Sequence, residues 1–425
     1  MSNEINKPHD PYAALRIRDF SVYMVARFCL TLGVQIQGVV VGIQIFKLAP
    51  GDIKHKALAM GYVGLAEAIP FILLAIFAGH IADVVRRKKI LLFSVGFLLI
   101  CSWLLFCITW DKTLLLSLGT LPIYGIIFCT GIARGFVSPV FPAFQSQLIP
   151  RSLYTNAATW NSNLWQTAAV LGPALGGLLM GFISIRFSYG VSSTLMTLSF
   201  FTFMFVTNHP LPPREKKEKL KDSLTAGLKF VFGNQIMISA LCLDLFAVLF
   251  GGAVAMIPVF AHSFLNLGDR ADMFVGFLRA APAAGSILMG LALAYFPPTK
   301  KAGRNLFIAV TGFGLCIIGF AFSSNVYLSF FLLLLSGSFD MVSVVIRHTI
   351  LQLMTPDNMR GRVSAVNGIF IGSSNEIGEM ESGLTARMMG VIPSVAFGGC
   401  MTIAVVGAVM FFAPKLRKLN LNEHV

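Results

Sequence analysis

The sequence predicts an all-α membrane protein of twelve transmembrane helices arranged as two six-helix bundles. The chain consists mainly of apolar stretches about 20 residues long, and a helix of that length spans the roughly 30 Å hydrocarbon core of a bilayer. Hydrophobic residues make up 56% of the 425 residues and charged residues only 12%, a balance typical of membrane proteins. One charged stretch, Asn208 to Asp222, divides the apolar stretches into two groups of six.

Each apolar stretch is expected to be a helix, because a spanning segment has to satisfy its own backbone hydrogen bonds. The short segments of alternating polarity that build an outer-membrane barrel are not found in the sequence. The first six expected helices cover 20–47, 57–82, 89–109, 113–140, 157–185 and 187–207. The second six cover 234–264, 273–296, 305–323, 326–352, 363–390 and 391–413. The expected units are therefore an N-terminal tail (1–19), a first bundle (20–207), a linker (208–233), a second bundle (234–413) and a C-terminal tail (414–425).

The net charge of +14 is explained by topology rather than by nucleic-acid binding. With both termini in the cytoplasm, most Lys and Arg residues outside the helices fall on the cytoplasmic side, which is the positive-inside pattern. The tail 1–19 does not resemble a cleavable signal peptide, so the first helix is expected to act as the insertion signal.

The sequence gives no indication of an enzyme, a cofactor or a metal site. All seven cysteines fall inside expected helices and none pairs at CxxC spacing, which indicates free thiols rather than a disulfide framework or a zinc site. Walker A, nucleophile-elbow and HExxH sequences are not present, so neither ATP hydrolysis nor hydrolytic catalysis is supported. We expect a monomer that takes its energy from a proton gradient.

The two halves of the chain are related by an internal repeat. A shift of 206 residues places Pro150 on Pro356, Asn161 on Asn367 and Gly177 on Gly383, and a shift of 212 places Gly64 on Gly276 and Pro70 on Pro282. Parallel repeats of six helices are the architecture of major facilitator transporters. The repeat therefore predicts the major facilitator fold.

The loop after the second expected helix, GHIADVVRRKK, resembles the signature of that superfamily. Its glycine, aspartate and basic residues are Gly79, Asp83, Arg86 and Arg87, although Val85 stands where the family usually has a second glycine. The resemblance implies that these residues form a latch that holds one conformation.

A second resemblance lies in the fifth expected helix, in which GPALGG is similar to the core of the motif associated with antiporters. Its residues are Gly172, Pro173, Gly176 and Gly177. The upstream glycines of that motif are replaced in this sequence, since Trp160 and Ala168 occupy their places.

A finer resemblance covers essentially the whole chain. The segments VARF, DLFAVLFGGAVAMIPVFA, LQLMTPDNMRGRVSAVNG and NEIGEMESG look like the enterobactin-exporter-like branch of the superfamily. That resemblance implies export of a siderophore or drug-like amphiphile across a bacterial inner membrane by alternating access. Other cargo, such as a lysophospholipid or a metal ion, and a non-transporting receptor or scaffold remain alternatives.

Ionisable residues inside the expected helices are functional candidates, because a charge at the bilayer centre costs about 3 kcal/mol on insertion scales. These residues are Arg27, Glu67, Arg134, Asp244, Arg279, Asp340, Arg347, Glu376, Glu379, Glu381 and Arg387. The repeat places opposite charges at equivalent positions three times: Arg134 with Asp340, Glu67 with Arg279, and Arg27 with Asp244. We expect these pairs to attract across the central cavity in one state; the alternative is that each charge is neutralised within its own half, for example Arg27 by Glu67.

The eleventh expected helix carries the densest polar patch and is the leading proton-coupling site. Glu376 and Glu379 share one helical face, and two neighbouring carboxylates hinder each other's ionisation, which favours proton loading. Asp244 and Asp340 are the next candidates, and a static network of the two glutamates with Arg387 is the alternative.

Polar amides are expected to line the cavity and contact the substrate. These residues are Gln35, Gln37, Asn161, Asn163, Gln166 and Asn375. For each of them, a structural role as interhelical hydrogen-bonding glue is the alternative.

Overall fold

The computed structural model describes residues 10–110, 117–208, 220–296, 298, 300–356 and 359–421. Within these ranges, side chains are described except at 75–80, 82–84, 151, 155, 220–224, 360, 361, 364, 365, 369, 373 and 376.

The described residues of the first half form six long helices, as the apolar stretches predict. They are α1 (Arg18–Leu48), α2 (Ile53–Val84), α3 (Arg87–Trp110), α5 (Leu121–Leu148), α6 (Tyr154–Phe182) and α7 (Ile185–Met204). The expected start of the helix at 113–140 lies outside the described residues; α5 has Pro122 in its first turn and continues through Pro139 and Pro142, past the expected end. Interior prolines do not end this helix, because neighbouring helices in a membrane bundle can satisfy the freed backbone groups.

The second half begins with a helix inside the expected linker, α8 (Leu220–Gly233). It continues with α9 (Gln235–Phe250), α10 (Ala253–Ser263), α11 (Ala271–Tyr295), α12 (Ala302–Phe322), α13 (Val326–Met354), α14 (Arg360–Met389), α15 (Val391–Phe412) and the short α16 (Pro414–Arg417). Ten helical segments in the described part of the chain are long and apolar enough to cross a membrane, counting α9 and α10 as one. The other long helices, α7 and α14, carry a higher proportion of polar residues than these ten segments.

The apolar span expected at 234–264 is present as Gln235–Ser263, but its helix is interrupted between α9 and α10 at Gly251 and Gly252. A Cβ atom at Gly252 would lie 2.2 Å from the Ser382 hydroxyl and 2.8 Å from the Gly378 carbonyl oxygen, both on α14. Gly252 therefore allows α14 to approach the break, a contact that a larger residue would prevent.

The helix contacts confirm the internal repeat. In the first half, α2 packs on α5, α3 packs on α5 and α7, and α1 packs on α6 and α7. The corresponding pairs in the second half are α11 on α13, α12 on α13 and α15, and α9 on α14 and α15. The two halves meet along α2 with α14 and along α6 with α11, which is itself a repeat-related pair of contacts.

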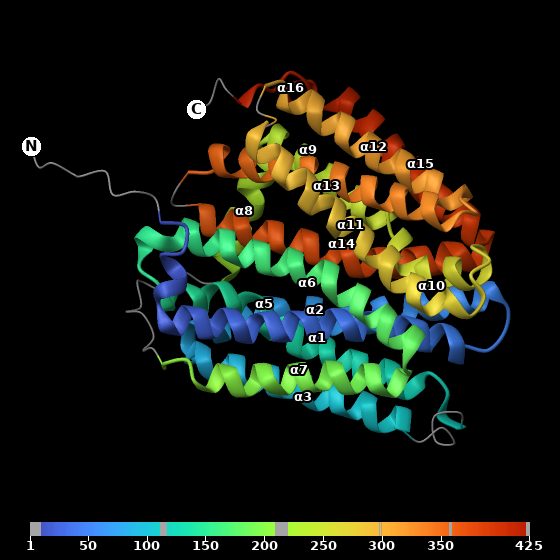
Figure 1. Ribbon diagram of the computed structural model, residues 1–425. Helices are drawn as coiled ribbons and strands as arrows, with labels where there is room; N and C mark the ends of the chain where they lie inside the picture. Colours follow the sequence, from blue (N-terminus) through green and yellow to red (C-terminus); the bar gives the residue numbers. More distant parts are fainter. Residues whose placement is uncertain are drawn as a thin grey trace, which may run out of the picture.

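Figure 1 shows the first half below the second, with the long helices running roughly parallel. We call the end at which α1 begins and α15 ends the terminal end; α8 and α16 lie toward it, at the left of the view. The opposite end, where α10 lies, is the distal end. The alternating helices thus place the end of α1, the start of α2 and the start of α11 together at the distal end.

Polar side chains stabilise helix ends outside the apolar core. The Asp52 carboxylate accepts the backbone N–H of His55 at 3.0 Å and caps α2, and this hydrogen bond holds the pKa of Asp52 below its usual range. At the terminal end, Lys88 donates to the Met204 carbonyl oxygen at 2.8 Å and to that of Val206 at 2.5 Å. The lysine thereby places a positive charge at the C-terminus of α7, where the helix dipole favours it.

Candidate functional site

The two halves touch at the distal end through glycines. A Cβ atom at Gly177 on α6 would lie 2.6 Å from the Cα of Gly276 on α11. A Cβ atom at Gly383 on α14 would lie 2.6 Å from the Cα of Gly61 on α2. Real Cβ atoms do not approach other carbons this closely, so only glycine permits the halves to close at this end.

The antiporter-like motif on α6 contributes to this closure. A Cβ atom at Gly172 would lie 2.4 Å from the Cβ of Gln35, and one at Gly176 would lie 3.2 Å from the Ile36 carbonyl oxygen. The Pro173 carbonyl oxygen would lie 2.3 Å from a Cβ atom at Gly276. The motif therefore packs α6 against α1 within the first half and against α11 across the boundary between the halves.

A polar contact at the distal end also joins the two halves. The Lys47 ammonium on α1 forms an ion pair with Asp272 on α11. The same carboxylate lies 2.8 Å from Nε2 of His262 on α10, whose ring lies 4.7 Å from that of Phe46. The Lys56 ammonium lies over the Phe46 ring, 4.7 Å from its centre. Sequence reasoning missed this contact, because Lys47 and Asp272 are ordinary helix-end charges until the fold brings them together.

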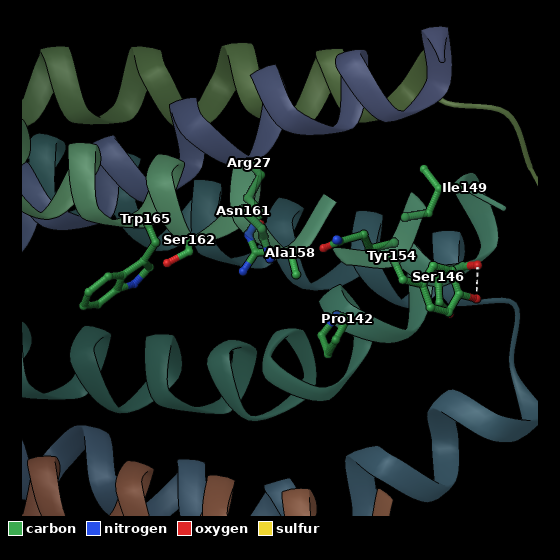
Figure 2. A pocket seen from close by; sticks show the side chains of 10 residues that line it. Arg27, Pro142, Ser146, Ile149, Tyr154, Ala158, Asn161, Ser162 and Trp165 are labelled. Carbon is green, nitrogen blue, oxygen red and sulfur yellow. Dashed lines mark hydrogen bonds between the residues drawn. The ribbon is translucent and has the colours of Figure 1, made fainter. Parts of the chain in front are cut away.

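A cavity of about 470 Å³ lies in the first half toward the terminal end. Figure 2 shows it between α1, the end of α5 and the first half of α6. The residues that line it are Arg27, Pro142, Gln145, Ser146, Ile149, Tyr154, Ala158, Asn161, Ser162 and Trp165. Two of the predicted site residues, Arg27 and Asn161, line this cavity, and their roles in charge pairing and substrate binding stay predictions.

Arg27 is held in this cavity by neutral groups. Its guanidinium donates to the Tyr23 hydroxyl at 3.0 Å and lies 4.7 Å from the centre of the Phe141 ring. Among the described residues, no carboxylate lies within 4.0 Å of it, so the predicted neutralisation of Arg27 by Glu67 is not what this conformation shows.

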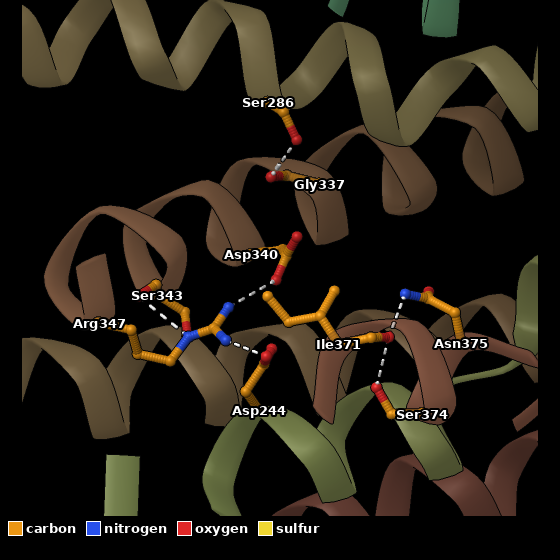
Figure 3. Close-up of polar contacts among 9 residues, drawn as sticks. All are labelled: Asp244, Ser286, Gly337, Asp340, Ser343, Arg347, Ile371, Ser374 and Asn375. Carbon is orange, nitrogen blue, oxygen red and sulfur yellow. Dashed lines mark hydrogen bonds and ion pairs between the residues drawn. The ribbon is translucent and has the colours of Figure 1, made fainter. Parts of the chain in front are cut away.

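In the second half, Arg347 on α13 forms an ion pair with Asp244 on α9 (Figure 3). Both side chains are almost fully buried, at 6% and 8% exposed. Asp340 lies 4.0 Å from the same guanidinium and is 44% exposed, and Ser343 accepts from the guanidinium Nε at 3.2 Å. Two predicted proton-coupling acids, Asp244 and Asp340, therefore share one arginine.

The remaining buried charges meet near the boundary between the halves. Arg134 forms an ion pair with Glu67 of the same half. Arg279 on α11 crosses the boundary and donates to the Gly38 carbonyl oxygen on α1 at 3.0 Å. Glu379 on α14 interacts electrostatically with Arg279, Glu67 and Arg134.

These pairs differ from the ones the repeat predicts. In this conformation Glu67 and Asp244 each pair with an arginine of their own half. This agrees with the alternative that each charge is neutralised within its own half, although the partners differ from the example given there. Pairing of repeat-equivalent charges in another conformation stays a prediction. Nη1 of Arg387 is buried without a hydrogen-bond partner in the part of the chain that the structure describes, and the side chain of Glu376 lies outside that part.

The predicted amides fall into three environments. Gln37, Asn161 and Gln166 each have a buried side-chain oxygen with no hydrogen-bond partner among the described residues. The side chain of Asn163 is exposed, and Asn375 donates to the Ile371 carbonyl oxygen at 2.9 Å (Figure 3). Gln35, the sixth, packs against Gly172 as described above.

The predicted latch is described only in part. Asp83 and Gly79 lie on α2 at positions where the structure does not describe side chains or their surroundings. Arg86 is exposed, and Arg87 donates to the Ala143 carbonyl oxygen at 2.7 Å, which ties the start of α3 to α5. The latch stays a prediction.

Comparisons with known proteins agree with this geometry. The profile of a family described as transmembrane secretion effectors matches residues 9–424. Enterobactin exporter EntS from Shigella flexneri is 25% identical over 402 residues, covering 91% of this chain and 90% of EntS, and EntS from Escherichia coli O1:K1 matches to the same extent.

Solved structures show the same fold. Nucleoside transporter NupG superposes with a TM-score of 0.70 at 12% identity, covering 93% of this chain and 98% of NupG. A D-xylose–proton symporter superposes with a TM-score of 0.70 at 12% identity, covering 96% of this chain and 98% of the symporter. A bacterial homologue of the lysosomal transporter Spinster, in an inward-facing and unoccupied conformation, gives a TM-score of 0.67 at 14% identity, covering 96% and 98% of the two chains. The chain therefore belongs to the transmembrane secretion effector family of major facilitator transporters, which are secondary transporters and not enzymes.

Proposed function

We propose that this protein is a proton-coupled exporter of a siderophore or drug-like amphiphile that works by alternating access in a bacterial inner membrane. The family supports secondary transport, and the relation to EntS supports a siderophore-like cargo. The positive-inside pattern supports a cytoplasmic location for the terminal end. The cavity in the first half then opens toward the cytoplasm, while the glycine contacts close the periplasmic side.

The observation that carries the coupling proposal is the position of Glu379. Its carboxyl group lies at the boundary between the halves and interacts electrostatically with Arg279 of its own half and with the Glu67–Arg134 pair of the other. Protonation of Glu379 removes one negative charge from this boundary and so changes the electrostatic attraction between the two halves. The relative stability of the conformations in which the halves touch and in which they separate changes by the same amount. Glu376, Asp244 and Asp340 are the further acids through which we propose that the proton moves.

Flux in proteoliposomes with an imposed pH gradient tests this function. Uptake of labelled enterobactin or of a fluorescent drug is expected to rise with the gradient for the unmodified protein and to lose that dependence in Glu379→Gln. Glu381→Gln is the matched control, because two residues along a helix place Glu381 about 200° away on the opposite face. Full coupling in Glu379→Gln and in Glu376→Gln would remove these residues from the mechanism.

The alternative cargoes are separated by the same assay with other labels. If the cargo is a lysophospholipid, a labelled lysophospholipid without an aromatic group is expected to be transported in this assay. A metal ion is less well supported, because the described residues contain no group of three or more His, Cys, Asp or Glu side chains that could hold one. A non-transporting receptor or scaffold would show no flux of any probe, and it leaves the cost of the buried charges unexplained.

A further inference from the structure

Repeat-equivalent positions in the two halves carry side chains of different charge. In the second half, Asp244 on α9 faces Arg347 on α13 and the two form a closed, buried ion pair. A shift of 217 residues relates Asp244 to Arg27, and a shift of 206 relates Arg347 to Phe141. The first half therefore has a cation and an aromatic ring where the second half has an anion and a cation.

Among the described residues, this difference leaves the positive charge of Arg27 without a carboxylate partner in the cavity of the first half. Within the part of the chain that the structure describes, the Arg27 side chain makes one hydrogen bond, to the Tyr23 hydroxyl, and one cation–π contact, to Phe141. A guanidinium carries five N–H donors, and neither contact supplies negative charge. The donors that remain can bind an oxyanion in the bidentate geometry that makes such pairs strong.

The rest of the cavity is suited to an aromatic body attached to that anion. Ala158, Asn161, Ser162 and Trp165 follow one another at helical spacing, so one face of α6 forms a wall of the cavity (Figure 2). The Trp165 side chain is 51% exposed and offers an aromatic surface. The volume of about 470 Å³ falls within the range of small-molecule sites.

We propose that Arg27 anchors the anionic group of an aromatic acid, and that the first half thereby selects negatively charged amphiphiles. This proposal rests on the proposed function only in requiring that the cargo enters the cavity. Arg27 binds the oxyanion, Trp165 stacks on the aromatic ring, and the Asn161 amide contacts a polar substituent. The negative charge of the cargo then neutralises Arg27 in the first half, as Asp244 neutralises Arg347 in the second half.

Binding of a matched pair of probes to the full-length protein in nanodiscs tests the site. The probes are 7-methoxycoumarin-3-carboxylate and its neutral methyl ester, and quenching of tryptophan fluorescence reports binding. The wild-type protein is expected to prefer the acid. Arg27→Gln is expected to weaken acid binding by about tenfold to hundredfold, the loss typical of a charge-assisted contact, with the ester changed by less than about twofold. Arg27→Lys is expected to retain part of the preference.

Two controls make the result specific. Arg304→Gln removes one positive charge at an exposed position outside the cavity and is expected to leave both affinities unchanged. Trp165→Phe is expected to remove most of the quenching, and isothermal titration calorimetry of the same variant checks that the acid still binds.

The proposal is overturned if the wild-type protein does not distinguish acid from ester, if Arg27→Gln binds the acid normally, or if it loses both probes equally. The last outcome would make Arg27 a structural residue. The assay uses no pH gradient, so loss of proton coupling in the flux assay would refute the proposed function while leaving the charge preference intact.

Discussion

Lys47 at the end of α1 forms an ion pair with Asp272 at the start of α11, so the distal end is closed by a charge contact between the two halves. Lys47 is 48% exposed and Asp272 is 14% exposed, so solvent screens the pair and its contribution is about 1 kcal/mol or less. Because the pair exists only when the halves touch, it biases the conformational equilibrium rather than the stability of either half.

We therefore expect Asp272→Asn to increase the ratio of distally open to distally closed molecules by up to about fivefold, the factor that about 1 kcal/mol represents. Double electron–electron resonance between spin labels at Lys54 and Arg270, which lie in different halves, measures this ratio as the weight of the longer distance. Asp269→Asn is the matched control, since Asp269 is an exposed acid three residues earlier. An unchanged distance distribution in Asp272→Asn would show that the contact has no gating role.

The glycine contact between Gly177 and Gly276 predicts a larger effect. Alanine at Gly177 places a Cβ atom 2.6 Å from the Gly276 Cα and 2.6 Å from the Met273 carbonyl oxygen. Relieving such overlap costs about 1–3 kcal/mol, and separation of the halves is the simplest way to relieve it. Gly177→Ala is expected to shift the same spin-label distances toward the open state and to slow transport.

Gly125→Ala provides the comparison for this substitution, because a Cβ atom at Gly125 would meet nothing within 4 Å. If both alanine variants transport and close alike, tight glycine packing across the boundary is not required for closure.

The buried Arg347–Asp244 pair predicts an effect on stability. Removal of one partner of a buried ion pair costs about 3–5 kcal/mol, because the other charge is left uncompensated. For Asp244→Ala we expect a loss near the lower end of this range, since Asp340 lies 4.0 Å from the same guanidinium. Replacement of both partners, as Asp244→Leu with Arg347→Met, is expected to recover most of the loss.

Unfolding of the purified protein in mixed micelles with increasing sodium dodecyl sulfate measures these free energies. A double variant as unstable as Asp244→Ala alone would mean that lost packing, rather than the stranded charge, accounts for the destabilisation.

The sequence predicted the fold well because membrane helices are marked by length and hydropathy. The break at Gly251–Gly252 was missed, since two glycines inside an apolar stretch do not by themselves interrupt a spanning segment. The end of α5 also differs from the prediction, since the helix continues through Pro139 and Pro142 to Leu148, beyond the expected end at 140. Both errors concern local backbone signals that tertiary packing overrides.

The candidate site was predicted less well than the fold. Hydropathy identified Arg27, Glu67, Arg134 and Asp244 as unusual, and in the structure each of the four has a polar or charged partner. Their partners were not predictable, because the repeat specifies which positions are equivalent but not which helices touch in one conformation. The distal contact of Lys47 with Asp272 had no signal at all, since charges at helix ends are common.

The Glu67–Arg134 pair leads to a last prediction, which separates the two hypotheses for the buried charges. If pairing within the first half governs transport, the reversed pair Glu67→Arg with Arg134→Glu restores an attractive contact between α2 and α5, and it is expected to transport better than either single variant. If repeat-equivalent charges attract in another conformation, the swap Arg134→Asp with Asp340→Arg is expected to transport better than its own single variants. Interaction energies of about 0.5–3 kcal/mol between contacting residues give a recovery of about twofold to more than a hundredfold, which the flux assay resolves. A cross-half swap no better than Arg134→Asp or Asp340→Arg alone would refute that pairing, whereas rescue by both swaps would mean that Arg134 exchanges partners as the halves move.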